Sequence, residues 1–482
     1  MRTCKNRLEC YAGPAVVYAS RKSRMISVGP LQLGGTAPIL LQSMLNVPLS
    51  EMDSCLAQVE SLRTAGCFLI RVALPTITSL RQFESLRHAV EGEHVAFVAD
   101  LHFGSQLALD ALDIFEKVRI NPGNFAIHRT PAPDGYDEKL FAREEEMVRE
   151  EADKFFRKAK KLRRVVRIGC NGGSVSARMR WRWGDETAAL LRSAEDMHRW
   201  ATDCDFSDLV FSFKASDPLQ TISLNVIASK KMACDGQHPP FHIGVTEAGV
   251  GSVGRVKGAL GIGVLLSQGI GDTIRVSLTE PPEKEISFAK KLLRFVGEHP
   301  LQAPKTCPAT LRVVEHVNSD ASTLKILPFP EPFDGDAAAL AILQQILVTP
   351  SAATICVVPG ANYEERREIV EDAVQACGFG KMRTEVIACP TCGRTTCDVA
   401  ALAKEVRRRL GNFPQLKIAV MGCVVNGVGE MGNADYGCIG CGGGNVNVYR
   451  RGVCLLRGVA SAGAVDELER LINADIGMES KP

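Results

Sequence analysis

Eight short apolar, β-rich runs recur between residues 35 and 280 of this 482-residue chain, and segments with helical spacing separate most of them. Strands that are apolar almost throughout and alternate with helices are typical of a parallel sheet covered on both faces. Eight such units predict a (β/α)8 barrel, with a doubly wound sheet as the alternative. No G-x-G-x-x-G sequence opens the first helix, which argues against dinucleotide binding. The runs are Ile39–Met44, Phe68–Ala73, Val95–Asp100, Lys117–Asn121, Val165–Cys170, Leu209–Lys214, Phe241–Thr246 and Thr273–Leu278.

The rest of the chain has a different residue pattern from the barrel segment. Prolines interrupt the stretch after it, where a strand at Thr354–Val358 and a helix at Glu364–Cys377 are expected. A compact α+β unit follows, with a cysteine-rich loop, a helix at Val399–Leu410 and a strand at Leu416–Met421. The predicted organisation is an N-terminal extension (1–24), the barrel (25–300), a short inserted spacer (301–380) and a small C-terminal domain (381–482).

Composition narrows the class of protein. The formal net charge is +2 at pH 7, which calls for neither a nucleic-acid nor a membrane partner. No apolar run reaches the roughly 18 residues of a transmembrane helix, and the first 24 residues lack the apolar core of a secretory signal. Most of the 17 cysteines stand singly in apolar runs. A reducing cytoplasm is therefore expected, where clustered cysteines indicate a metal site.

Positively charged side chains recur at or near the ends of five predicted strands. In a (β/α)8 barrel these ends open on one face, where active sites lie. Five cations at one mouth repel one another unless an anion joins them, and guanidinium groups suit phosphate oxygens. The pattern predicts a phosphate or, given the number of cations, a diphosphate site. The cations are Arg71, Arg119, Arg167, Lys214 and Arg275; the polar residues nearby are Asp100, His102, Asn121, Asn124, Asn171, Ser216, Thr246, Glu247 and Ser277.

The alternative is that carboxylates of the barrel neutralise these cations. Asp100, Glu247 and Asp272 could each take a partner, but only the first two lie at strand ends, too few for five cations. Glycine-rich turns at 121–124 and 171–174 follow two of the strands and would let backbone amides approach a ligand. We therefore favour the anion site.

Cysteines gather again near the C-terminus. Cys389 and Cys392 form a C-x-x-C loop, and Cys423 follows in a G-C-x-x-N-G-x-G-E sequence that ends on Glu430. Thiolates on tight loops hold zinc or iron–sulfur clusters. The absence of a C-x-x-x-C-x-x-C triad argues against radical SAM chemistry.

A structural zinc site is a second interpretation of these cysteines. Cys438 and Cys441 form another C-x-x-C pair, and with Cys389 and Cys392 they would make a Cys4 set. The separation of the two pairs is longer than the usual zinc-ribbon spacing.

Eight stretches, in order, resemble the motifs of the 4-hydroxy-3-methylbut-2-enyl diphosphate synthase family. The resemblance covers residues from about 25 to 450, and SLTEPPEKEI and the long 126–166 connection are closer to the plant and chlamydial branch, with a shortened insert. The stretches are VADLHF, RINPGN, RIGCNGGS, FSFKASDP, HIGVTEAG, GIGDTIRVSL, ACPTCGRT and MGCVVNGVGE.

The resemblance implies a [4Fe–4S] cluster held by Cys389, Cys392, Cys423 and Glu430. Oxygen binds iron more weakly than thiolate does, so substrate could displace the carboxylate. The implied substrate is 2-C-methyl-D-erythritol 2,4-cyclodiphosphate, which is opened and dehydroxylated by two electrons to 4-hydroxy-3-methylbut-2-enyl diphosphate. Ferredoxin or flavodoxin is the expected donor. Closure of the cluster domain on a barrel is expected either in a homodimer or within one chain.

The resemblance and the strand-end pattern together assign roles to the barrel residues. Glu247, beside Thr246, is the candidate for the proton needed when hydroxide leaves, and Asp100 and His102 are expected to support it. The expected substrate-binding residues are Arg71, Arg119, Asn121, Asn124, Arg167, Asn171, Lys214, Ser216, Arg275 and Ser277.

The chain departs from the family pattern at three places. Val428 replaces a proline in the cluster loop, and Leu45-Asn46-Val47 replace a threonine-rich stretch. Cys438 and Cys441 are outside the family's cluster ligands. Two other functions stay open at this point: a sirohaem-type sulfite or nitrite reductase, and a zinc-stapled phosphate-binding barrel without redox activity.

Overall fold

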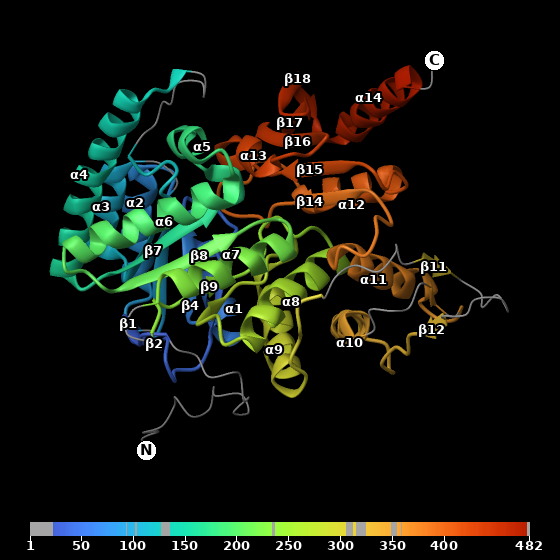
Figure 1. The fold of residues 1–482 in the computed structure, drawn as a ribbon, viewed down its shortest axis with the longest axis horizontal. Coiled ribbons are helices and arrows are strands. Elements are labelled where there is room, and N and C mark those ends of the chain that lie inside the picture. Colours follow the sequence, from blue (N-terminus) through green and yellow to red (C-terminus); the bar gives the residue numbers. More distant parts are fainter. Residues whose placement is uncertain are drawn as a thin grey trace.

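The computed structural model describes residues 23–92, 94–101, 104–126, 135–233, 237–304, 312–314, 324–348, 354–357 and 359–479. Eight parallel strands form one sheet in the order β8-β7-β6-β5-β4-β3-β10-β9, and a parallel bridge between Phe211 and Phe241 joins its two ends. The predicted (β/α)8 barrel is thus confirmed (Figure 1). Its strands are β3 (Leu40–Met44), β4 (Leu69–Ala73), β5 (Ala96–Asp100), β6 (Lys117–Ile120), β7 (Val165–Asn171), β8 (Leu209–Lys214), β9 (His242–Ile243) and β10 (Thr273–Ile274).

The first six barrel strands lie within one residue of their predicted bounds, whereas β9 and β10 are shorter than predicted. Hydrogen bonding continues past these two short strands but loses the regular ladder. The amide of Arg275 donates to the carbonyl of Ile243, and the amide of Thr246 donates to the carbonyl of Ala215. The apolar pattern therefore marked extended chain correctly, but it could not show where the pairing becomes irregular at the mouth.

Helices cover the outside of the barrel. The long helix α4 (Glu138–Leu162) follows its N-cap Asp137 and buries Phe155 and Phe156. The hairpin of β1 (Ile26–Val28) and β2 (Leu31–Leu33) packs its apolar side chains on the inner bottom of the barrel. The remaining helices of the barrel are α1 (Met52–Thr64), α2 (Ile77–Ala89), α3 (Ser105–Ile114), α5 (Ala177–Trp183), α6 (Glu186–Asp203), α7 (Pro218–Lys231), α8 (Ser252–Ser267) and α9 (Pro282–Glu298).

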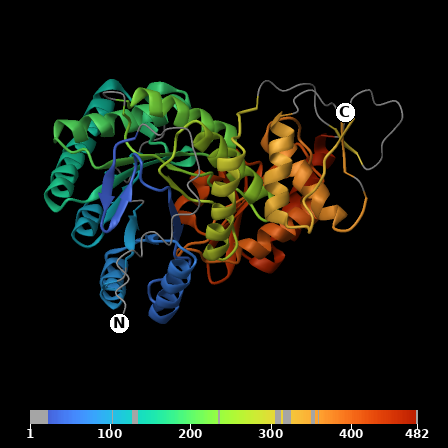
Figure 2. The ribbon, with the colours of Figure 1, turned by 90° about the horizontal axis from the view of Figure 1, so that it is seen from below.

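The segment predicted as a spacer forms a small layer beside the barrel. Three short strands pair in parallel in the order β11-β13-β12, and helices α10 and α11 pack on α8. Figure 2 shows these two orange helices alongside the yellow α8 and α9. The buried side chains of α10 and α11 belong to the same apolar core as the barrel. The elements are β11 (Arg312–Val314), β12 (Leu324–Ile326), α10 (Gly335–Val348), β13 (Thr354–Cys356) and α11 (Tyr363–Ala376).

A second, five-stranded sheet carries the C-terminal domain. Its order is β14-β15-β16-β17-β18, parallel over the first three strands and antiparallel over the last two. Helices α12 and α14 pack on one face and α13 on the other. The elements are β14 (Glu385–Ala388), α12 (Val399–Leu410), β15 (Lys417–Met421), α13 (Val424–Met431), β16 (Tyr436–Gly442), β17 (Asn445–Arg450), β18 (Val453–Ala460) and α14 (Ala464–Glu479).

The C-terminal domain of the chain lies on the mouth of the chain's own barrel. Ala248 and Ala388 form a parallel bridge between the two domains, and Lys257 of α8 binds Glu385 of β14 at 2.6 Å. Helix α13 also contacts the short 3-10 turn Gly172–Ser174 after β7. Of the two modes of closure left open by the sequence, the structure has the one within a single chain. Among the described residues, no helix has the length and apolar character needed to cross a membrane.

Candidate active site

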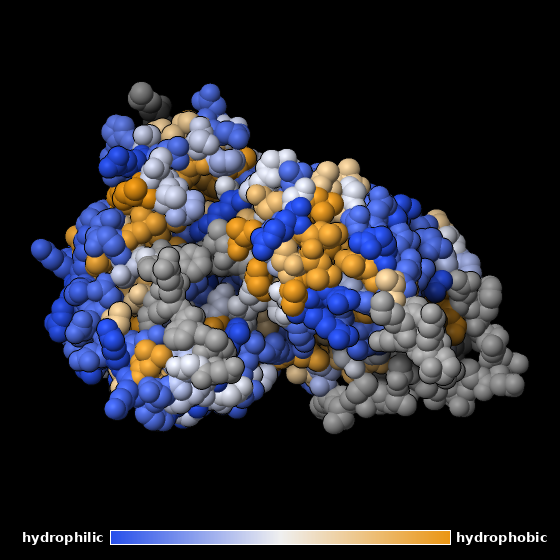
Figure 3. Space-filling model, turned by 90° about the horizontal axis from the view of Figure 1, so that it is seen from above, coloured by the Kyte–Doolittle hydropathy of each residue, from blue (hydrophilic) through white to orange (hydrophobic). Residues whose placement is uncertain are grey.

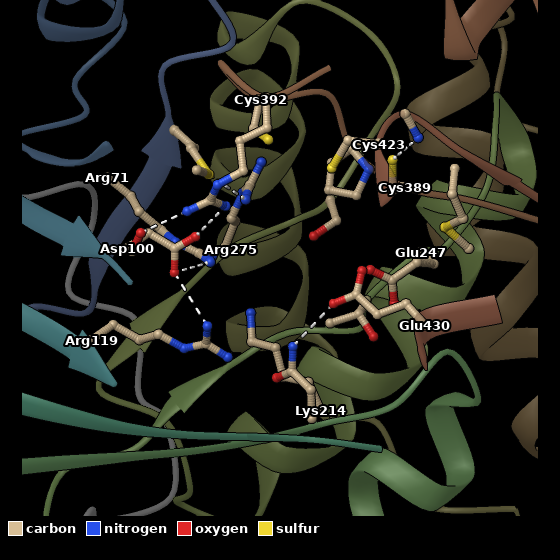
Figure 4. A pocket seen from close by; sticks show the side chains of 18 of the residues that line it. Arg71, Asp100, Arg119, Lys214, Glu247, Arg275, Cys389, Cys392, Cys423 and Glu430 are labelled. Carbon is tan, nitrogen blue, oxygen red and sulfur yellow. Dashed lines mark hydrogen bonds and ion pairs between the residues drawn. The ribbon is translucent and has the colours of Figure 1, made fainter. Parts of the chain in front are cut away.

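A cavity lies between the barrel mouth and the C-terminal domain (Figure 4). Strand-end side chains of the barrel form one wall, and the cysteine-bearing loops with α13 form the other. Fourteen of the predicted site residues line it: Arg71, Asp100, Arg119, Arg167, Asn171, Lys214, Thr246, Glu247, Arg275, Ser277, Cys389, Cys392, Cys423 and Glu430.

Four predicted residues are not among those that line the cavity. Asn121 uses its Oδ1 to accept the amide of Gly123 at 2.9 Å, so its side chain stabilises the turn after β6. Asn124 and Ser216 are partly buried near the mouth but are not part of the lining. His102 lies outside the described residues.

Two glycines make room for the cations of the mouth. A Cβ atom at Gly169 on β7 would collide with the guanidinium of Arg119, which extends from the neighbouring β6. A Cβ atom at Gly244, just after β9, would press on the Nζ of Lys214. Side chains at alternate positions of neighbouring parallel strands point into the barrel, so a glycine beside a long cation leaves space for it.

Three of the five predicted cations have carboxylate partners. Asp100 binds Arg71 at 2.6 Å and Arg119 at 3.4 Å. Arg275 binds Glu285 at 3.1 Å, and Glu285 also accepts a hydrogen bond from Ser43 at 2.6 Å. Glu285 lies in α9, inside the SLTEPPEKEI stretch, away from the strand ends, and it was not predicted as a partner. Its partnership with Arg275 means that neutralisation within the barrel goes further than predicted.

The other two cations, Arg167 and Lys214, form no ion pair with any described residue, and the Nε and Nη1 of Arg167 have no hydrogen-bond partner. Burial, together with the charges of Arg71 and Arg119, holds the pKa of Arg167 well below its usual value. Burial and the charge of Arg167 do the same to the pKa of Lys214. A bound anion would relieve this repulsion, since it supplies both charge and acceptor oxygens.

Two carboxyl groups meet on the side of the cavity opposite Asp100 (Figure 4). Burial, and then the charge of Glu430, raise the pKa of Glu247 well above its ordinary value, and burial raises the pKa of Glu430. Two neighbouring buried carboxyls favour holding a proton between them. The amide of Asn171 lies 3.5 Å from Glu430 Oε1, so residues of the barrel contact α13 directly.

Three thiols and a carboxyl face the cations from the C-terminal domain. Cys389 and Cys392 follow β14, Cys423 is the N-cap residue of α13, and Glu430 lies near the end of that helix. The amide of Gly422 donates to Cys389 Sγ at 3.1 Å. Iron–sulfur clusters are held by thiolates on tight loops with amide donors to sulfur, and this wall supplies donors of that kind.

The four cysteines of the alternative zinc site do not lie around one point. Cys438 and Cys441 both lie on β16, but Cys438 is in its regularly paired part and Cys441 is at the register shift between Gly440 and Gly442 near its end. Cys438 is accordingly buried in the apolar core, and Cys441 is exposed. Neither lines the cavity with Cys389 and Cys392.

One further cation of the cavity was missed. Arg394, two residues after Cys392, reaches the barrel and donates to Asp100. The stretch ACPTCGRT contains it, but an arginine in a loop gives no local sign of its partner. Met44 and Ser212 also line the cavity without having been predicted.

These features define a class of barrel protein with a cation-rich mouth, closed by a domain that carries three thiols and a carboxyl. The GcpE TIM-barrel domain model matches residues 23–290, and the GcpE protein C-terminal domain model matches residues 385–474. The chain belongs to the GcpE family, as its motifs predicted.

Curated relatives align over nearly the whole chain. A 4-hydroxy-3-methylbut-2-en-1-yl diphosphate synthase (flavodoxin) of Porphyromonas gingivalis is 31% identical over 94% of this chain and 97% of its own length. Synthases (ferredoxin) of Synechococcus sp. strain JA-3-3Ab and Gloeobacter violaceus are each 32% identical over 96% of this chain, and over 93% and 96% of their own lengths. The prediction of an oxidoreductase of this family is thereby confirmed.

Proposed function

We propose that this chain reduces 2-C-methyl-D-erythritol 2,4-cyclodiphosphate to 4-hydroxy-3-methylbut-2-enyl diphosphate. The reaction opens the cyclic diphosphate and removes one hydroxyl as water, consuming two electrons and two protons. The observation that carries the proposal is that buried cations and a three-thiol, one-carboxyl set line the same cavity from opposite sides. The names of the relatives point to the same product.

The barrel wall would hold the diphosphate. Arg167 and Lys214, the two cations without a carboxylate partner among the described residues, are the primary candidates for its oxygens. Each charge-assisted hydrogen bond contributes about 1.5–3 kcal/mol. Arg71, Arg119 and Arg275, already held by Asp100 and Glu285, would orient the ligand rather than neutralise it alone. Asn171 and Ser277 supply neutral donors beside them.

Cys389, Cys392, Cys423 and Glu430 would hold the [4Fe–4S] cluster. When bound, the cluster supplies electrons one at a time. The amide of Gly422 stabilises negative charge on Cys389 Sγ, and Arg394 places a cation on the same wall. Helix α13 packs closely on the turn 172–174, because a Cβ at Gly173 would collide with the backbone of Gly429.

Glu247 would supply the proton for the departing hydroxyl. Glu247 is 5% exposed as a whole residue, lines the cavity and lies beside Glu430. Glu247 takes a φ of +45°, an unfavourable backbone conformation for a residue with a side chain, as positions under functional constraint often do. Thr246 precedes it at the rim, and Asp100 lies across the cavity among the cations.

The donor would be a ferredoxin or a flavodoxin, as named for the relatives. Helix α13 begins at Cys423, and its residues Val424 and Val428 are 52% and 47% exposed. Figure 3 shows apolar side chains gathered among hydrophilic ones on the upper face of the molecule. Exposed apolar side chains next to a cluster ligand give a carrier a contact surface close to the redox group.

The test is the metal content and turnover of protein purified without oxygen. About four irons and four sulfides per chain, with little zinc, and reduction of the cyclodiphosphate by a reduced donor would support the proposal. A single zinc without sulfide, or a loaded protein that leaves the cyclodiphosphate unchanged, would contradict it. We also propose a cytoplasmic location for the protein and the domain bounds predicted from the sequence.

A further inference from the structure

Arg394 joins the two domains inside the cavity. It belongs to the loop after Cys392 in the C-terminal domain, and its side chain, 7% exposed, crosses to the barrel. Its Nη1 donates to Asp100 Oδ2 at 3.1 Å, and its Nη2 donates to the Asp100 carbonyl at 2.7 Å. One guanidinium group thus donates to both the side chain and the backbone of Asp100, at the end of β5.

The acceptor of this contact also belongs to the anion site. Asp100 binds Arg71 and Arg119, two cations of the barrel wall, through Oδ1. Arg394 lines the cavity as well, and its buried Nε has no hydrogen-bond partner among the described residues. A single carboxylate therefore lies between the closing domain and the cations that would hold a diphosphate.

The charges at the mouth make closure depend on a bound anion. Without an anion, closure brings Arg394 into a mouth that already holds several cations, and like charges in a buried site repel. A diphosphate neutralises the positive charge of the mouth and binds Arg71 and Arg119. The Asp100 carboxylate is then more available to Arg394. Binding of the anion and closure of the domain then favour each other, and such coupling is reciprocal.

We propose that Arg394 is a positioning residue that links diphosphate binding at the barrel mouth to closure of the C-terminal domain. The inference rests on the proposed function, since it takes a diphosphate as the ligand. Lys257 and Glu385 provide the matched control. They form a second ion pair between the same two domains, at 2.6 Å, but neither residue lines the cavity. Removing that pair should leave the dependence of closure on the anion unchanged.

The experiment compares wild type, Arg394→Gln, Arg394→Lys and Glu385→Gln as cluster-loaded proteins, with inorganic diphosphate as the ligand. Calorimetry gives the dissociation constant, and hydrogen–deuterium exchange of segments 172–174 and 424–431 reports closure, because α13 packs on that turn. In wild type, diphosphate should slow exchange in both segments. Circular dichroism and iron content check that each variant is folded and loaded.

We expect Arg394→Gln to weaken diphosphate binding about tenfold and to lose most of the protection at saturating ligand, tenfold being equal to about 1.4 kcal/mol. Arg394→Lys keeps the charge but cannot make both contacts with Asp100, so its affinity should be closer to wild type while protection stays reduced. Glu385→Gln should bind within about twofold of wild type and keep the protection.

Wild-type affinity and protection in Arg394→Gln would overturn the inference and leave the proposed function intact. An equal loss of protection in Glu385→Gln would also overturn it, since any contact between the domains would then suffice. If wild type does not bind diphosphate, that result would contradict the proposed function, and this inference would fail with it.

Discussion

Replacing Arg167 by Met tests whether the buried cations exist for a ligand or for the fold. Methionine is unbranched and of similar length, so the change removes charge with little loss of volume. Arg167 has two buried nitrogens without partners, and burial together with the nearby arginines depresses its pKa. An unsatisfied buried donor costs about 1–3 kcal/mol. Arg167→Met should therefore raise the free energy of unfolding by about 1 kcal/mol or more when no anion is present.

The same substitution should weaken the binding of a diphosphate. A charge-assisted contact of about 1.5–3 kcal/mol corresponds to a loss of about 10- to 150-fold in affinity. Arg119→Met is the matched comparison, because Arg119 binds Asp100 and donates to the carbonyl of Gly169 at 3.2 Å. It should lose both affinity and stability, since it leaves native acceptors without a donor.

Calorimetric titration with inorganic diphosphate and urea unfolding without it measure the two quantities for both variants. For Arg167→Met we expect diphosphate affinity to fall while the free energy of unfolding rises. For Arg119→Met we expect both to fall. Unchanged diphosphate affinity in Arg167→Met, or a loss of stability as large as in Arg119→Met, would refute the assignment of Arg167 to an anion.

Four further outcomes are expected. Glu430→Ala should abolish turnover of the cyclodiphosphate, because the carboxyl at the cavity is lost, while an intact set of three thiols keeps most of the iron measured per chain. Cys441→Ser should leave iron content and turnover at wild-type levels, since this thiol lies exposed at the end of β16, whereas Cys392→Ser should lose the cluster absorbance. Gly173→Ala should lower kcat at least tenfold with the iron content unchanged, because the added methyl collides with α13; normal turnover would show that this contact does not matter. Val428→Glu should slow turnover driven by a reduced ferredoxin or flavodoxin but not turnover driven by dithionite, and equal slowing with both would place the donor elsewhere.

Several tertiary contacts had no local signature. Glu285 neutralises Arg275 from α9, and Arg394 reaches Asp100 across 294 positions of the chain. Each partner by itself is an ordinary charged residue in a helix or loop. Their pairing depends on the angle at which whole elements pack, and no spacing rule in the sequence encodes that angle.

The two C-x-x-C pairs show the same limit within one motif. By spacing alone, Cys438 and Cys441 are as good a ligand pair as Cys389 and Cys392. The first pair lies on a loop, where both thiols line the cavity. The second lies on strand β16, where Cys438 is buried in the regularly paired part and Cys441 is exposed at the irregular end. Secondary structure thus decided which pair lines the cavity.

By itself, the sequence determined the barrel, the family and most of the residues at the cavity. Apolar runs and helical spacing are local patterns, and parallel strands of a barrel necessarily bring their ends to one mouth. Only the tertiary structure decided that the C-terminal domain closes on its own barrel, which cations keep a carboxylate partner and that Arg394 contacts Asp100. Those outcomes depend on distances between residues far apart in the chain, which are set when the packed domains exclude water and bury their charges together.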